Sequence, residues 1–144
     1  MYAAAPVNEI YQPVMTVREG EAEIEIQLPS NYHHAAGAVH GSVYFKMLDD
    51  AAFFAANAFE TEVFVLTTSF TTYLTRPVSS GSMRSVGRVV NKNKTQFIVE
   101  SIVYNEDGVE IGRGNGIFVR GKTRLQDAAG YQDGYDAARA DAKH

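Results

Sequence analysis

The chain has 144 residues, no cysteine and a formal net charge of −4 at pH 7. The absence of cysteine excludes disulfides, thiolate zinc sites and cysteine nucleophiles. The acidic balance and the lack of a concentrated basic face argue against a nucleic-acid-binding protein. The length and the 45% apolar content predict one globular domain with a substantial core.

The N-terminal residues have neither the basic start nor the long apolar core of a signal peptide. The longest apolar run, residues 51–56, is too short to cross a bilayer. We therefore expect a soluble protein of the cytoplasm.

The first elements expected are an N-terminal arm over residues 1–13 and a short β-hairpin. Apolar side chains alternate with Glu and Gln from residue 21 to 28, which predicts a half-buried strand. Residues 14–18 are expected to pair with it across the turn at Glu19-Gly20. The His-, Ala- and Gly-rich residues 29–39 indicate an irregular loop.

Residues 41–59 predict one long helix, because they are rich in Ala, Leu and Met and contain no proline. Apolar residues surround this helix almost completely, and a helix of that kind is buried. The polar residues that interrupt it are Lys46, Asp49, Asp50 and Asn57.

Four strands are expected after the helix, over residues 63–74, 83–90, 95–104 and 109–119, and their short turns imply an antiparallel meander. One buried helix followed by such strands favours an α+β domain over residues 14–120, with the sheet wrapped round the helix. Three glycines on one face of the last strand predict close approach by the helix or a ligand, namely Gly112, Gly114 and Gly116. Residues 121–144 are expected to be a tail, with a helical turn or two near Tyr135.

Asp49 is the first candidate for chemistry. Lys46 can pair with Asp49 at i+3 or with Asp50 at i+4, and the second spacing is at least as good. Asp49 is turned about 100° from Asp50, towards an apolar row of the helix. Since a carboxylate buried there is costly unless it is used or compensated, we favour a functional role for Asp49.

The start of the helix is the second candidate. Gly41 permits close approach of a ligand, and the first N–H groups of a helix are unpaired donors at its positive end. Such donors suit a carbonyl oxygen that becomes an oxyanion. The simpler alternative is an ordinary helix start, capped by Ser42 or His40.

Gly41 and Asp49 are separated by about 12 Å along the helix axis and about 80° around it. One helix therefore does not bring both groups to one reacting carbon, whereas two antiparallel copies do. The spacing predicts a symmetric dimer with two shared sites.

Other chemistries fit poorly. The spacing of His33, His34 and His40 is not that of a metal site, so we expect no metal. No Gly-x-Ser-x-Gly elbow exists for a catalytic triad, and no helix follows residues 112–116, as a nucleotide-binding loop requires. The cations available to a phosphorylated ligand are Arg76, Arg84, Arg88, Lys92, Lys94, Arg113 and Arg120.

A family resemblance rests on two motifs. Gly37-Ala38-Val39-His40-Gly41-Ser42, with Asp49 nine residues after His40, resembles the signature of PaaI-like hotdog-fold acyl-CoA thioesterases. Tyr73-Leu74-Thr75-Arg76-Pro77-Val78 resembles a strand ending of that family, with one extra residue. The resemblance covers about residues 14–120. It implies a hotdog fold, a homodimer or a dimer of dimers, and hydrolysis of a CoA thioester without a cofactor.

The resemblance also implies roles for single residues. Asp49 would be the general base or nucleophile, and Gly41 would present its N–H to the thioester oxygen from the other subunit. Thr67 or Thr68 would supply a hydroxyl near the attacking water. His34 stands where the family has Asn. The substrate contacts expected besides these are His40, Ser42, Tyr73 and Arg76.

Two alternatives stay open. One is a non-catalytic acyl-CoA-binding protein of the same fold. The other is a hotdog dehydratase or hydratase, whose usual motifs are absent. The acyl group is also open, because an aliphatic and an aryl pocket fit equally well with the nearby aromatic residues Phe45, Phe53, Phe54 and Tyr73.

Overall fold

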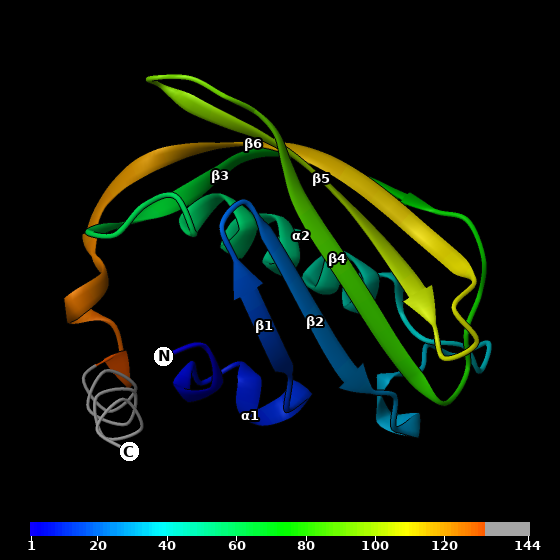
Figure 1. Cartoon of the computed structure of the whole chain (residues 1–144). Helices are drawn as coiled ribbons and strands as arrows, with labels where there is room; N and C mark the ends of the chain where they lie inside the picture. The colour runs from blue at the N-terminus through cyan, green and yellow to red at the C-terminus, as the bar shows by residue number, and fades with distance from the viewer. Residues whose placement is uncertain (132–144) are drawn as a thin grey trace, which may run out of the picture.

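The structure is a computed structural model, and it describes residues 1–131 (Figure 1). Its helical elements are η1 (Tyr2–Ala4), α1 (Asn8–Tyr11), η2 (Ser30–Tyr32), α2 (Gly41–Asn57) and η3 (Leu125–Asp127). Its strands are β1 (Val14–Arg18), β2 (Glu21–Gln27), β3 (Val63–Leu74), β4 (Ser82–Lys92), β5 (Gln96–Asn105) and β6 (Glu110–Arg124).

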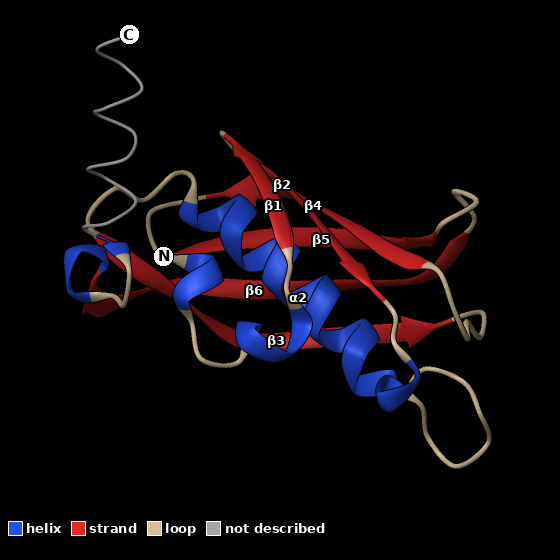
Figure 2. Ribbon diagram, turned by 90° about the horizontal axis from the view of Figure 1, so that it is seen from below, coloured by secondary structure: helices blue, strands red, loops and turns tan. Residues whose placement is uncertain are grey.

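The six strands form one antiparallel sheet in the order β1-β2-β4-β5-β6-β3. The sheet curves round α2, as Figures 1 and 2 show from two directions. The α+β hotdog fold expected from the sequence is thereby confirmed. The helix and the concave face of the sheet enclose the core, to which α2 contributes Met47, Leu48, Ala51 and Ala52.

The expected meander is wrong for β3. β4, β5 and β6 follow one another as hairpins, but β3 pairs with β6 at the far end of the sheet and not with β4. The seven residues 75–81 link β3 to β4, and they include Pro77. This connection is longer than a tight hairpin turn, so it can cross the end of the sheet. β3 is consequently an edge strand.

The backbone of α2 lies directly against the sheet. Ser85 Oγ on β4 donates a hydrogen bond of 2.7 Å to the Met47 carbonyl, and Ser101 Oγ on β5 donates one of 2.9 Å to the Leu48 carbonyl. A Cβ atom at Gly87 would lie 2.3 Å from the Ala51 carbonyl oxygen, so only glycine fits there. These contacts hold the helix against the sheet on both sides of Asp49.

The glycines of β6 are explained by a neighbouring side chain and not by a ligand. A Cβ at Gly114 or at Gly116 would come within 2.5 Å of the Phe70 ring, which β3 sends over them. At Gly112 the nearest atom is the Tyr73 carbonyl oxygen, at 2.9 Å. Gly114 and Gly116 therefore make room for Phe70 within the β3–β6 pair, whereas Gly112 lies against the β3 backbone and near Tyr44 of α2.

The expectation that a tail begins at residue 121 is wrong, because β6 continues to pair with β3 as far as Arg124 and is followed by η3. The apolar side chain of Leu125 is buried there. The helical turns expected near Tyr135 lie outside the described residues. Among the described residues, no helix is long and apolar enough to span a membrane.

Candidate active site

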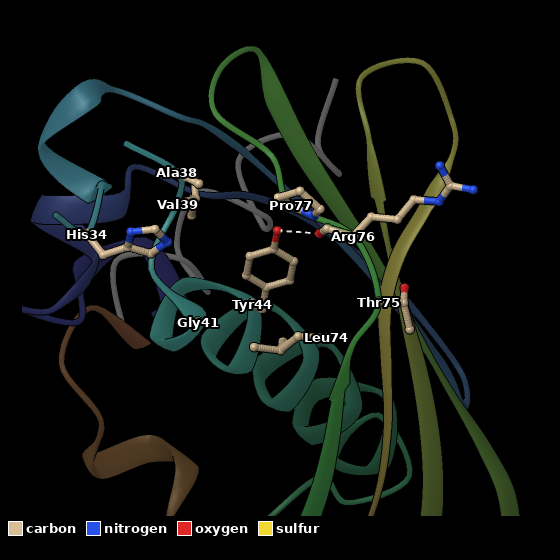
Figure 3. A pocket seen from close by; sticks show the side chains of 9 residues that line it. All are labelled: His34, Ala38, Val39, Gly41, Tyr44, Leu74, Thr75, Arg76 and Pro77. Atoms are coloured by element: carbon tan, nitrogen blue, oxygen red, sulfur yellow. Dashed lines mark hydrogen bonds between the residues drawn. The ribbon is translucent and has the colours of Figure 1, made fainter. Parts of the chain in front are cut away.

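A pocket of about 320 Å³ opens at the N-terminal end of α2 (Figure 3). Three segments build it: the loop after η2, the first turn of α2, and the residues that follow β3. The residues that line it are His34, Ala38, Val39, Gly41, Tyr44, Leu74, Thr75, Arg76 and Pro77.

Gly41 is the first residue of α2 and lies in the wall of this pocket. As the first helical residue it has no carbonyl one turn earlier to receive its N–H. His40 is the N-cap: its Nδ1 accepts a hydrogen bond of 3.0 Å from the Ser42 N–H and lies 2.7 Å from Ser42 Oγ. His40 thus serves the helix end, and neither His40 nor Ser42 lines the pocket.

His34 lines the pocket beside the start of α2, across from Thr75 and Arg76 (Figure 3). The Ala36 N–H donates a hydrogen bond of 3.0 Å to His34 Nδ1. In the neutral ring a nitrogen that accepts leaves the hydrogen on the other nitrogen, so Nε2 carries it. The Nε2–H of His34 can therefore donate a hydrogen bond. The amide nitrogen of Asn, the residue that the family has at this position, is a donor too.

Tyr44 is not among the candidates that the sequence analysis names. It and Ser42 carry the only hydroxyl groups in the first turns of α2. Its ring lines the pocket, and its hydroxyl donates a hydrogen bond of 2.7 Å to the Arg76 carbonyl (Figure 3). Burial raises the pKa of Tyr44, which keeps this donor protonated. Tyr44 therefore ties the helix to the chain after β3.

Asp49 lies about two turns after Gly41 in α2, and its half-buried side chain is beside β3. The Thr67 hydroxyl donates a hydrogen bond of 3.0 Å to Asp49 Oδ1. Burial raises the pKa of the Asp49 carboxyl most strongly; Thr67 acts in the opposite direction, Asp50 raises it further, and Lys46 lowers it. The net effect is a raised pKa, because burial disfavours the charged form of the carboxyl.

The structure also separates the two threonines. The β3–β6 register shifts between Thr67 and Ser69, which leaves Thr68 as the extra residue of a bulge. The Thr68 hydroxyl donates to the Ile117 carbonyl, at 3.0 Å. Thr67 is therefore the threonine that contacts Asp49.

The candidate residues fall into two groups within one protomer. His34, Gly41 and Arg76 share the pocket, whereas Asp49 and Thr67 contact each other and do not line it. Tyr73 lies on β3 with its side chain half exposed, outside the pocket lining. Within the described residues, no three His, Cys, Asp or Glu side chains are clustered so that they could hold a metal ion.

An antiparallel sheet curved round one long helix defines a hotdog-fold protein. This protein has in addition a donor-lined pocket at the start of the helix and, further along the helix, a carboxylate bonded by a hydroxyl. A sequence profile of the Thioesterase superfamily matches residues 36–111, which include His40, Gly41, Asp49 and Thr67. The chain belongs to this superfamily.

Individual relatives agree with that placement. The chain is 26% identical over 102 residues to a protein of Thermoplasma volcanium that is named "Putative esterase TV1331"; the match covers 71% of this chain and 77% of that protein. Among solved structures, the E. coli PaaI protein from the phenylacetic acid degradation operon has a TM-score of 0.78 at 16% identity, with 86% of this chain and 90% of that chain covered. The conserved protein PA5202 of Pseudomonas aeruginosa has a TM-score of 0.74 at 22% identity, with 81% and 94% covered. The resemblance to PaaI-like hotdog thioesterases is confirmed.

Proposed function

We propose that the protein is an acyl-CoA thioesterase whose two identical sites are shared between subunits of a dimer. The observation that carries this proposal is the division of the site within one protomer. The lining of the pocket has donors and no carboxylate, and Asp49, with its hydroxyl partner Thr67, lies outside that lining. A second copy that places its Asp49 opposite the first copy's Gly41 completes both sites.

The exposed edge of β3 supports this arrangement. β3 pairs with β6 on one side only, so the backbone groups on its other side are free within the protomer. Its apolar side chains Leu66, Tyr73 and Leu74 are each about half exposed, at 52%, 52% and 54%. An apolar edge strand is a template for pairing with another chain. We propose a homodimer formed through β3, with a dimer of dimers as a further level.

The proposed reaction is acyl transfer from CoA to water. The Gly41 N–H and the His34 Nε2–H of one subunit hold the thioester oxygen and stabilise its negative charge. The partner's Asp49 removes a proton from water, whose oxygen bonds to the acyl carbon. The C–S bond then breaks, the CoA sulfur takes the electron pair and a proton, and the free acid leaves.

A covalent route uses the same atoms. The partner's Asp49 carboxylate attacks the acyl carbon directly, CoA leaves, and water hydrolyses the resulting anhydride. Both routes require Asp49 to be ionised, and Thr67 stabilises that form by donating to Oδ1. We further propose that Arg76, a lining residue whose side chain extends away from the other lining side chains in Figure 3, binds a CoA phosphate.

The test is thiol release from a panel of short-chain, long-chain and aryl acyl-CoAs. We expect release with at least one thioester and a loss of about 10²–10⁴ in kcat for Asp49→Asn. The matched control is Asp107→Asn, in the exposed β5–β6 turn. Full activity of Asp49→Asn would refute the assignment. Tight thioester binding without thiol release would favour the non-catalytic alternative, and a hydrated or dehydrated acyl product the other enzyme class.

A further inference from the structure

The N-terminal arm, residues 1–13, lies on the side of α2 that faces away from the sheet (Figures 1 and 2). It is outside the residues that match the superfamily profile. The Tyr2 ring packs edge-on against Phe54 of α2, with 4.8 Å between ring centroids. The Tyr32 hydroxyl donates a hydrogen bond of 2.6 Å to the Ile10 carbonyl and holds the other end of the arm. The arm is thus fastened at two points.

Under this arm the structure encloses a charged pair. Lys46 Nζ lies 2.5 Å from Asp50 Oδ2, and the Tyr2 hydroxyl donates a hydrogen bond of 2.7 Å to the same oxygen. The rings of Tyr2 and Tyr11 lie 5.5 and 5.1 Å from Lys46 Nζ, within the range of cation–π attraction. The side chains of Lys46 and Asp50 are only 14% and 19% exposed, so water screens their charges weakly.

This pair acts on the adjacent carboxylate. Asp50 raises the pKa of Asp49, because a second negative charge nearby disfavours ionisation, and Lys46 lowers it. From the sheet, β3 presents the Thr67 hydroxyl and has no charged residue between Val63 and Leu74. Among the described residues, Asp50 and Lys46 are accordingly the charged groups that act on the pKa of Asp49, in addition to burial and the Thr67 hydrogen bond.

We propose that Lys46 and the arm residue Tyr2 are positioning residues for the reaction: they compensate the charge of Asp50, so that Asp49 can ionise beside it. The proposal rests on the proposed function of Asp49 as base or nucleophile. It gives the arm a chemical task, since Tyr2 supplies the second hydrogen bond to Asp50 and, with Tyr11, covers Lys46.

The test follows the carboxyl titration of Asp49 by NMR in protein labelled with ¹³C-aspartate, where comparison with Asp49→Asn assigns the signal. It needs no ligand. Lys46→Met should raise the Asp49 titration midpoint by about one pH unit, because Asp50 is then uncompensated. Asp50→Asn should lower the midpoint, and Lys46→Met with Asp50→Asn should cancel most of the increase. Tyr2→Phe keeps the ring and should shift the midpoint in the direction of Lys46→Met, by less.

The acid limb of kcat/KM for the most rapidly hydrolysed acyl-CoA should move by the same amounts. Arg18→Met, at an exposed position of β1, should leave both readouts unchanged. An Asp49 midpoint that is unaltered in Lys46→Met and in Asp50→Asn would overturn the proposal. A double variant that titrates like Lys46→Met would also overturn it, because a merely structural role predicts no rescue. Full activity of Asp49→Asn would instead refute the proposed function and leave the titration result standing.

Discussion

Thr67 and Asp49 meet across the interface between β3 and α2, where the Thr67 hydroxyl donates a hydrogen bond of 3.0 Å to Asp49 Oδ1. The contact links the edge strand to the central helix at the one carboxylate that the sequence singles out for chemistry. The bulge at Thr68 changes the register of β3 directly after this position. The residue that contacts the proposed base therefore belongs to the strand with the free edge.

Thr67→Val should reduce kcat about tenfold, which corresponds to ~1.4 kcal/mol for one lost hydrogen bond to a charged group. Since that bond favours the ionised carboxylate, its loss raises the pKa of Asp49 and moves the acid limb of the pH–rate profile to higher pH. Thr68→Val is the matched control, because its hydroxyl bonds the Ile117 carbonyl instead. Equal effects of the two substitutions would contradict the assignment.

Substitutions of His34 should show whether its role is to donate a hydrogen bond or to act as a base. If Nε2–H holds the thioester oxygen, His34→Asn keeps a donor and should retain activity within about tenfold, whereas His34→Ala should lose about 10²–10³ in kcat. Steady-state kinetics at pH 7 and 8 measures both variants. Activity of His34→Ala close to that of the unaltered protein would show that the donor is not needed.

Mixing two inactive variants should restore activity if each site takes groups from two subunits. A heterodimer of Asp49→Asn and His34→Ala has one site with both defects and one intact site. Random exchange therefore gives about a quarter of the unaltered activity per site. The measurement is thiol release after the mixture is partly unfolded and refolded, and each variant treated alone is the control. No recovery in verified heterodimers would place both groups in the same subunit.

Asp49→Asn should stabilise the protein at neutral pH. The folded pKa of Asp49 is above its unfolded value of 3.8, so folding binds a proton and this contribution to stability is lost as pH rises through the folded pKa. Asparagine has no charge to bury and escapes that loss. Calorimetry should show a Tm a few degrees higher than that of the unaltered protein at pH 7, and a smaller difference below pH 4. A lower Tm at pH 7 would contradict the direction of the shift.

The fold was largely predictable from local pattern. The strict alternation in β2 and the Ala-rich helix from Gly41 each have one interpretation, and β1 and β3 begin and end at the residues expected. The position of β3 was not predictable, because the choice between β4 and β6 as its neighbour depends on how the sheet closes round α2. Alternation along β3 is the same for both neighbours.

Part of the candidate site was also predictable from the sequence and part was not. Asp49 was singled out because a carboxylate is conspicuous in an apolar helix, and the i+4 spacing correctly assigned Lys46 to Asp50. The choice of Thr67 over Thr68 depends on a bulge that leaves no mark in composition. Tyr44 was missed because an aromatic residue on a core helix looks like packing until its hydroxyl is seen bonded to the Arg76 carbonyl. The roles of His40 and Ser42 in substrate contact, and that of Tyr73, stay predictions.

Gly87 sets a limit on redesign of this enzyme scaffold. With the Ala51 carbonyl against it, any side chain at position 87 would push the helix away from the sheet. The hydrogen bonds from Ser85 and Ser101 to the helix backbone hold the two layers at this spacing, so we expect that a larger acyl chain is not accommodated by moving them apart. Variation meant to widen substrate range belongs at apolar residues of the pocket wall, such as Ala38 and Val39, and not along β3, through which we propose the dimer forms. Libraries that leave position 87 untouched should therefore yield a larger share of folded variants than libraries that include it.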